Sequence, residues 1–191
     1  MLDTPNDRKA ALERLKAQFS DRNWRLDNLY YVQDETGTRV LYRRRPAQRA
    51  YCEDTWLLDI IAKARQLGMS SQVGVEMLDT AIFSKNKACG IIDYKLEDAK
   101  KKLEKIKFAY ENLPAYIRQS VMLTKDNEDE IRFSNGSSIT VGTSHRGGTL
   151  QFLHVSEFGK TAAEKPEVAS EIVNGAFNTI APGQRIVVES T

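Results

Sequence analysis

Residues 63–71 carry the residue types of a phosphate-binding loop. An apolar run ends at Ala62, and Lys63-Ala64-Arg65-Gln66-Leu67-Gly68-Met69 then leads to the hydroxyls of Ser70 and Ser71. A strand that turns into a helix in this way presents unpaired backbone N–H groups at a helix N-terminus, where the helix dipole favours phosphate. Ser70 occupies the position whose hydroxyl normally binds Mg²⁺. We therefore predict a site for ATP and Mg²⁺; the alternative is an ordinary turn capped by Ser70.

The positive charge of this loop departs from the usual pattern. The pattern G-x-x-x-x-G-K-[ST] places lysine directly after the second glycine, and Met69 occupies that position. Lys63 stands instead where the first glycine would be, and Arg65 follows two residues later. Either side chain can curl back toward the β- and γ-phosphates. The sequence leaves open which of the two is the phosphate-binding cation.

A second polar pair follows the apolar segment 150–155. Ser156-Glu157 stands where phosphate-loop ATPases carry two acids, one that binds Mg²⁺ through water and one that orients the attacking water. We predict Glu157 as the catalytic base. Ser156 can hydrogen-bond a water of the Mg²⁺ shell but adds no negative charge, so we expect a weaker metal affinity than a carboxylate would give. The alternative is that Glu157 is a solvated residue at a strand end.

Three further positions have side chains suited to a nucleotide. Gln48 carries an amide that can pair with the two edge groups of adenine. Arg146, in the turn 144–148, is placed to reach a γ-phosphate of its own subunit or of a neighbour. Glu189-Ser190-Thr191 ends the last apolar strand, on the γ-phosphate side of the predicted site. A surface glutamine and an unbound loop arginine are the alternatives, and the two histidines show no metal-ligand spacing.

The elements that position these residues alternate between strand and helix patterns. The order predicts an α/β fold with a central, mostly parallel sheet flanked by helices. A helix at 7–19 and a hairpin at 29–42 precede it, so we divide the chain into an appendage, 1–45, and a P-loop ATPase core, 46–191. Residues 120–130 are predicted to be an exposed loop. The core strands and helices are expected at 56–62, 70–83, 88–93, 95–112, 131–133, 138–141, 150–155 and 185–188.

Composition limits the possible partners. The 191 residues fit about one domain, and a net charge of +2 restricts any DNA contact to local patches. Arg43-Arg44-Arg45 and the lysines of 95–112 are the candidates. Cys52 and Cys89 lie far apart without a nearby histidine, which argues against zinc and against a disulfide scaffold. No apolar run is long enough to span a bilayer, so we expect no membrane partner.

Taken together, these motifs resemble the ATPase domain of tailed-phage terminase large subunits, P-loop NTPases of the additional-strand, conserved-glutamate class. The motifs are Gln48, Lys63 to Ser71, Arg146 to Leu150, Leu153 to Phe158 and Glu189 to Thr191. The resemblance implies a motor in the host cytoplasm that hydrolyses ATP to move double-stranded DNA into a procapsid. It implies a homo-oligomeric ring on the portal protein, working with a small terminase subunit.

The resemblance also implies residue roles. Gln48 would read adenine, Lys63 to Ser71 would bind the phosphates, and Glu157 would be the catalytic carboxylate. Arg146 would complete a neighbour's site, and Glu189 to Thr191 would couple hydrolysis to movement. Terminases continue into a ribonuclease-H-type nuclease domain whose acidic cluster we do not find, so we expect no nuclease activity.

Two other functions remain open. A helicase-like ATPase uses the same core, although the sequence contains only one phosphate-loop core and no second motor domain in tandem. A nucleotide-binding or assembly module without turnover is favoured by Met69 and by the neutral Ser156.

Overall fold

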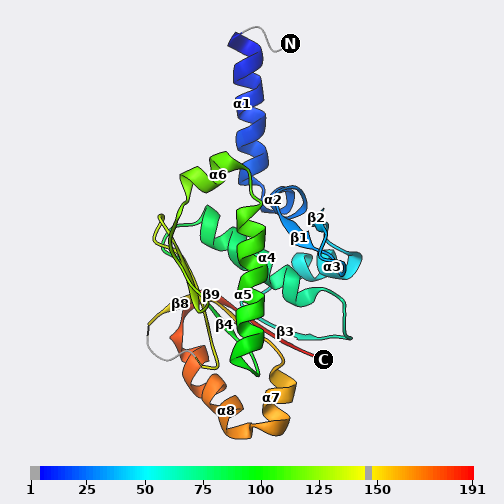
Figure 1. The fold of residues 1–191 in the computed structure, drawn as a ribbon, viewed down its shortest axis with the longest axis vertical. Coiled ribbons are helices and arrows are strands. Elements are labelled where there is room, and N and C mark those ends of the chain that lie inside the picture. Colours follow the sequence, from blue (N-terminus) through cyan, green and yellow to red (C-terminus); the bar gives the residue numbers. More distant parts are fainter. Residues whose placement is uncertain (1–4, 145–147) are drawn as a thin grey trace.

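A seven-stranded sheet forms the centre of the computed structural model, which describes residues 5–144 and 148–191 (Figure 1). The strand order is β3-β9-β8-β4-β7-β6-β5; the neighbours from β3 to β7 are parallel, and β6 and β5 are antiparallel. This confirms the predicted fold class. The strands are β3 (Leu58–Ala62), β4 (Ala88–Ile92), β5 (Leu123–Asp126), β6 (Glu130–Phe133), β7 (Ser138–Gly142), β8 (Leu150–Val155) and β9 (Ile180–Ser190).

The last strand, β9, lies between the loop strand β3 and the Glu157 strand β8. It pairs in parallel with both, with Ile186 opposite Leu58 on one side and Leu153 on the other. Parallel strands bring their carboxyl ends to one edge of a sheet, where ligands of open α/β folds bind. This edge therefore gathers the loop after β3, the segment 189–191 at the end of β9 and Ser156-Glu157 after β8.

Helices α4 (Met69–Phe83) and α5 (Leu96–Glu111) begin and end within one residue of the predicted helices. They pack against each other, and α4 also contacts β4, β7 and α2. Because neighbours cover it on several sides, α4 is buried along most of its length, including Val73, Met77 and Leu78. Such a helix is hydrophobic around much of its circumference rather than along one stripe.

The N-terminal part confirms the predicted helix and hairpin and adds a helix. α1 (Pro5–Ser20) extends away from the body (Figure 1), which leaves Leu12 and Leu15 about half exposed. The hairpin is β1 (Tyr31–Gln33) and β2 (Arg39–Leu41), and α3 (Pro46–Glu53) follows it. The added helix is α2 (Arg22–Asn28), which the sequence analysis does not predict. Leu26 and Tyr30 share one buried core with α4. The division of the chain at residue 45 into an appendage and an ATPase core stays a prediction.

A buried ionic contact fastens α2 to α4. The Asp79 carboxylate of α4 accepts from Arg25 Nη2 at 2.7 Å and Nε at 2.8 Å, and from the Tyr30 hydroxyl at 2.7 Å. All three residues are less than 10% exposed. Each oxygen of this buried carboxylate thus has a donor, as buried charges require.

The expectation of a loop at 120–130 is wrong, because β5 runs through it and pairs with β6. β5 is an edge strand, and edge strands tolerate the polar residues that suggested a loop. The remaining helical segments are α6 (Ala115–Ser120), α7 (Phe158–Glu164), α8 (Pro166–Glu171), a π-helical turn (Ile172–Ala176) and a 3₁₀ turn (Phe177–Thr179). Within the described ranges, no helix is long and apolar enough to cross a membrane.

Candidate nucleotide site

The loop 63–68 joins β3 to α4 and ends in a left-handed residue. Gly68 has a φ of 72° and precedes the first turn of α4. A Cβ added to it would lie 2.9 Å from Gln48 Nε2. Glycine is therefore required here both for the backbone conformation and for the approach of Gln48.

Gln48 holds this loop through its side chain. It is 2% exposed; its Nε2 donates to Gly68 O at 2.9 Å, and its Oε1 accepts from Arg45 N at 2.7 Å. Arg45 itself donates from Nη1 to Gln66 O at 2.9 Å. The oxygen and the nitrogen of the Gln48 side-chain amide thus each contact a backbone atom. The adenine-reading role stays a prediction and requires the amide to exchange these partners.

The structure separates the two candidate cations. Lys63 is nearly buried, and its Nζ lies 3.6 Å from Glu189 Oε2 at the centre of the site. Arg65 is exposed and lines a cavity of about 340 Å³ on the loop side, together with Gln66, Glu157 and Thr191. Met69 is buried with the core residues. Lys63 is thus the cation already at the point where loop and strands meet.

The Glu189 carboxylate is the centre of this edge of the sheet. It is fully buried, and its Oε1 accepts from Ser70 Oγ at 2.5 Å, from Ser156 Oγ at 2.9 Å and from His154 Nε2 at 3.1 Å. One carboxylate of β9 therefore joins the phosphate loop, through Ser70, to the end of β8. Among the described residues, its Oε2 has no hydrogen-bond partner.

The surroundings keep Glu189 ionised. Burial by itself raises the pKa of a carboxyl group, because it disfavours the charged form. The hydrogen bonds from His154 and Ser70 and the charges of His154 and Lys63 outweigh burial and lower the pKa of Glu189 to about 2. The site therefore holds a permanent negative charge beside Ser70 at neutral pH.

Glu157 is linked to the same segment by Thr191. Its Oε2 accepts from Thr191 Oγ1 at 3.1 Å, and Gly159 N donates to Ser190 Oγ at 3.1 Å. Glu157 precedes α7 with a φ of 53°, a strained conformation for a residue with a side chain. Such strain is found preferentially at functional sites. Residues 189–191 thus contact Ser70 at one end and the predicted base at the other.

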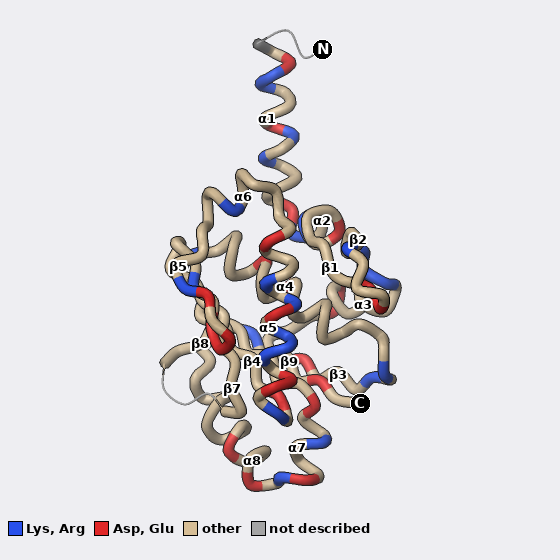
Figure 2. The backbone as a smooth tube through the Cα atoms, viewed as in Figure 1, with Lys and Arg blue, Asp and Glu red and all other residues tan. Residues whose placement is uncertain are grey.

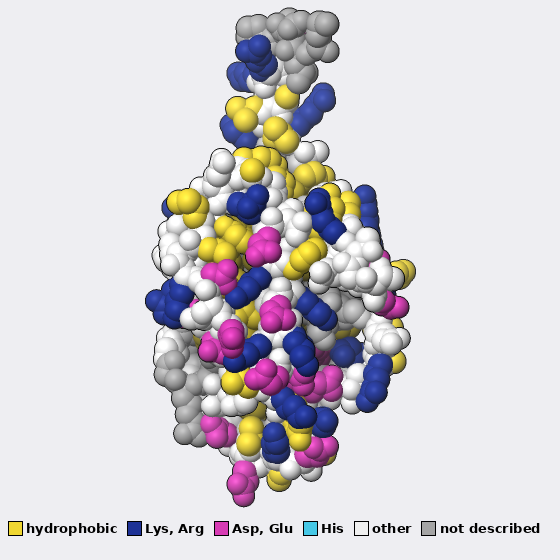
Figure 3. Space-filling view, in the orientation of Figure 1, with side chains coloured by type: hydrophobic (Ala, Val, Ile, Leu, Met, Phe, Trp, Pro, Cys, Tyr) yellow, Lys and Arg dark blue, Asp and Glu magenta, His cyan; other side chains and the backbone are white. Residues whose placement is uncertain are grey.

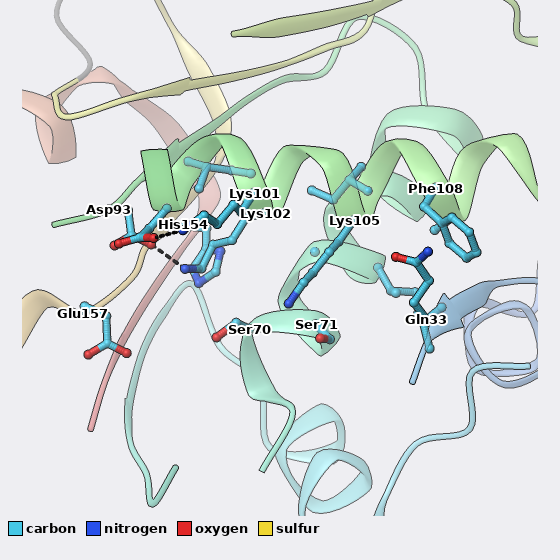
Figure 4. A pocket seen from close by; sticks show the side chains of 17 residues that line it. Gln33, Ser70, Ser71, Asp93, Lys101, Lys102, Lys105, Phe108, His154 and Glu157 are labelled. Carbon is cyan, nitrogen blue, oxygen red and sulfur yellow. Dashed lines mark hydrogen bonds and ion pairs between the residues drawn. The ribbon is translucent and has the colours of Figure 1, made fainter. Parts of the chain in front are cut away.

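A cavity of about 390 Å³ opens between α4 and α5 (Figure 4). Glu157 and Asp93 lie at one end, Gln33 and Phe108 at the other, and Ser70 and Ser71 lie along one side. Glu157 and Asp93 also line the loop-side cavity. Glu157 is therefore accessible from both sides of the loop.

Two residues of this site escape the sequence analysis. His154 is buried against Glu189, and Asp93 follows β4 and forms an ion pair with Lys102. His154 stands inside an apolar strand, where the sequence gives no sign of its partner. The one indication is Ser156, because a neutral residue at that position requires a charged group from another part of the site. Arg146 lies outside the described residues. Among the residues that the structure describes, no three His, Cys, Asp or Glu side chains form a metal-binding group.

The proposed DNA-contact residues are largely paired. Arg44 is buried and forms an ion pair with Asp27 at 2.9 Å, so it is a structural residue rather than a surface one. The lysines of α5 alternate with acidic residues along this face (Figures 2 and 3). The ion pairs are Lys100 with Glu128, Lys101 with Asp98 and Lys107 with Asp126. This pairing weakens the case for a phosphate-binding face on α5.

No family model matches the sequence. The chain superimposes on the crystal structure of the HK97 bacteriophage large terminase with a TM-score of 0.64 at 13% identity, over 79% of this chain and 34% of that one. The chain also superimposes on the Thermus phage P74-26 large terminase ATPase domain, with a TM-score of 0.54 at 16% identity, over 78% of this chain and 65% of that one. The chain has the fold of a large terminase ATPase domain. It spans about a third of the HK97 terminase and less than two thirds of the P74-26 domain. The terminase fold is thus established by shape, independently of the motifs.

Proposed function

We propose that this chain is the ATPase of a DNA-packaging motor, binding ATP at residues 63–71 and hydrolysing it with Glu157 as the base. The main support for this proposal is that residues 189–191, within a terminase fold, contact both the predicted phosphate-binding loop and the predicted base. Glu189 accepts from Ser70 at 2.5 Å, and Thr191 donates to Glu157 at 3.1 Å. Phosphate loop and base are thereby parts of one hydrogen-bonded unit.

The loop and its flanking residues have separate tasks in this proposal. The first N–H groups of α4 face the phosphates, and Lys63 moves from Glu189 to a phosphate oxygen. Glu157 is half-buried and lines both cavities, so water reaches it and is oriented for attack.

The donors at Ser70 fit Mg²⁺. They are a hydroxyl and the buried, ionised Glu189 carboxylate, whose Oε2 lacks a hydrogen-bond partner within residues 5–144 and 148–191. Mg²⁺ prefers oxygen donors and uses only one or two carboxylates beside phosphates and water. When bound, the ion neutralises charge on the phosphate oxygens.

Glu157→Gln tests the proposal. Mg²⁺-dependent ATP turnover should fall about 10²- to 10⁴-fold, the contribution of a general base, while binding of a fluorescent ATP analogue is kept. Glu167→Gln, at an exposed position in the first turn of α8, is the matched control and should turn over ATP normally. Turnover that survives Glu157→Gln would contradict the assignment.

The packaging context belongs to the same proposal. The terminase fold and the motifs support double-stranded DNA, a portal protein, a procapsid and a small terminase subunit as partners, in the host cytoplasm. In a homo-oligomeric ring, Arg146 would complete the neighbouring subunit's site. Turnover per chain that rises with protein concentration, and does so less in Arg146→Ala, would support this arrangement.

A nucleotide-binding module without turnover is the second candidate. The neutral Ser156 favours it, because the strand that carries the base has no metal-side acid of its own. Nucleotide binding with no Mg²⁺-dependent turnover in the parent chain would support this candidate.

A further inference from the structure

Position 156 lacks the carboxylate that a phosphate-loop ATPase places beside its loop serine. The Ser156 side chain is 1% exposed and donates its hydroxyl to Glu189 at 2.9 Å. Its oxygen therefore adds no negative charge to the site. Some other residue must supply that charge if the proposed hydrolysis depends on Mg²⁺.

We propose that Glu189, on the neighbouring strand β9, supplies this metal-side carboxylate. The inference rests on the proposed ATPase function. Glu189 Oε1 is within hydrogen-bond distance of both Ser70 Oγ, at 2.5 Å, and Ser156 Oγ, at 2.9 Å. The acid thus lies between the predicted metal ligand of the loop and the position whose acid is missing.

The other oxygen of Glu189 provides an independent observation. In the part of the chain that the structure describes, Oε2 is buried without a hydrogen-bond partner, and Lys63 Nζ lies 3.6 Å from it. A buried carboxylate oxygen without a donor is costly unless a cation compensates it. Lys63 compensates it here, and a metal ion would do so once Lys63 turns to the phosphates.

Ser156 and His154 hold the carboxylate in place during this exchange. His154 is buried on β8, Ser156 is buried directly after it, and both contact Oε1, so neither has to move when Ser70 and Lys63 change partners. An acid at position 156 would instead put two carboxylates within one small buried space, and their repulsion would disfavour ionisation of one of them. The serine at 156 and the glutamate at 189 are therefore complementary.

The test measures metal binding directly. The full chain is titrated with Mn²⁺ in the presence of a non-hydrolysable ATP analogue, and free Mn²⁺ is followed by electron paramagnetic resonance. Glu189→Gln keeps an acceptor oxygen for Ser70, Ser156 and His154 but loses the charge. We expect it to weaken Mn²⁺ binding at least about tenfold, since even indirect contacts to metal ligands contribute that much.

Relocating the carboxylate is the decisive comparison. The paired variant Ser156→Asp with Glu189→Gln returns one acid to the site from β8 and should recover Mn²⁺ affinity to within about threefold of the parent chain, less than the effect of one lost ligand contact. Glu167→Gln should bind Mn²⁺ like the parent chain. Glu157→Gln should lose turnover and keep Mn²⁺ binding, which separates the base from the metal ligand.

Parent-like Mn²⁺ affinity in Glu189→Gln, with the analogue bound, would overturn this inference and leave the ATPase proposal standing. Failure of the parent chain to bind nucleotide would overturn the ATPase proposal itself. If Glu189→Gln folds poorly by thermal melting, the paired variant decides: recovered Mn²⁺ affinity supports the relocated acid, and lost affinity in a folded paired variant overturns it.

Discussion

Ser70 Oγ lies 2.5 Å from Glu189 Oε1 although 119 residues separate them in the sequence. This contact joins the first turn of α4 to the end of β9, and Thr191 extends the link to Glu157. In the ATPase that we propose, a nucleotide that takes Ser70 away from Glu189 would therefore change the surroundings of Glu157. This would be a physical route by which nucleotide binding and the segment 189–191 affect each other.

Replacing Lys63 should weaken nucleotide binding more than replacing Arg65. Lys63 is at the centre of the site beside Glu189, whereas Arg65 is exposed. A hydrogen bond to a charged group contributes about 1.5–3 kcal/mol, so Lys63→Ala should raise the dissociation constant for ATP roughly 10- to 100-fold. Isothermal titration of both alanine variants checks this. The assignment is wrong if only Arg65→Ala loses affinity.

Gly68→Ala should destabilise the chain more than Gly37→Ala. Both glycines have positive φ values, 72° and 80°, so both substitutions carry backbone strain. Only at Gly68 would the new Cβ also meet Gln48 Nε2, at 2.9 Å, whereas nothing lies within 4 Å at Gly37. We expect a cost of about 1 kcal/mol at Gly37 and more at Gly68. Urea unfolding measures both, and equal losses would rule out a contribution from the Gln48 contact.

Removing the acid that fastens α2 to α4 should be strongly destabilising. Asp79→Ala leaves the buried Arg25 guanidinium and Tyr30 hydroxyl without their partner, and breaking a buried pair costs about 3–5 kcal/mol. Asp98→Ala removes an exposed pair with Lys101 and should cost less than about 1 kcal/mol. The free energies of unfolding in urea compare the two. Similar losses would mean that α2 is not held by this contact.

Glu189 should make the stability depend on pH below about pH 5. Its pKa is about 2 in the folded chain and near 4.3 when unfolded, so the unfolded state binds more protons between these values. The stabilisation, about 3 kcal/mol, is therefore complete above pH 5 and is lost as the pH falls toward 2. In Glu189→Gln this part of the pH dependence should be absent.

The measurement compares urea unfolding of the parent chain and Glu189→Gln at several pH values between 3 and 7. The difference in unfolding free energy should shrink as the pH is lowered. A difference that stays constant would show that His154 and Lys63 do not hold the carboxyl group ionised.

The sequence predicts the elements better than their arrangement. Local patterns locate α4, α5 and most strands of the sheet within a residue or two, because an apolar run or an amphipathic period is a property of neighbouring residues. The insertion of β9 between β3 and β8 is a pairing across more than a hundred residues, which no local pattern records. The same reason hides the contacts that Glu189 and His154 make. Each depends on a neighbour from another strand, whereas the loop 63–71 and Glu157 are recognisable within a few residues.

The place of β9 also sets the order of folding. Among the described strands, β3 pairs only with β9, and β8 meets β3 only through it. β9 is also the last of these strands to leave the ribosome. The loop strand must therefore wait without a partner strand until residues 180–190 have been synthesised. Pairing of the central strands is therefore a late, long-range event. We expect chaperones to bind the nascent chain mainly before this pairing, while β3 has no partner strand.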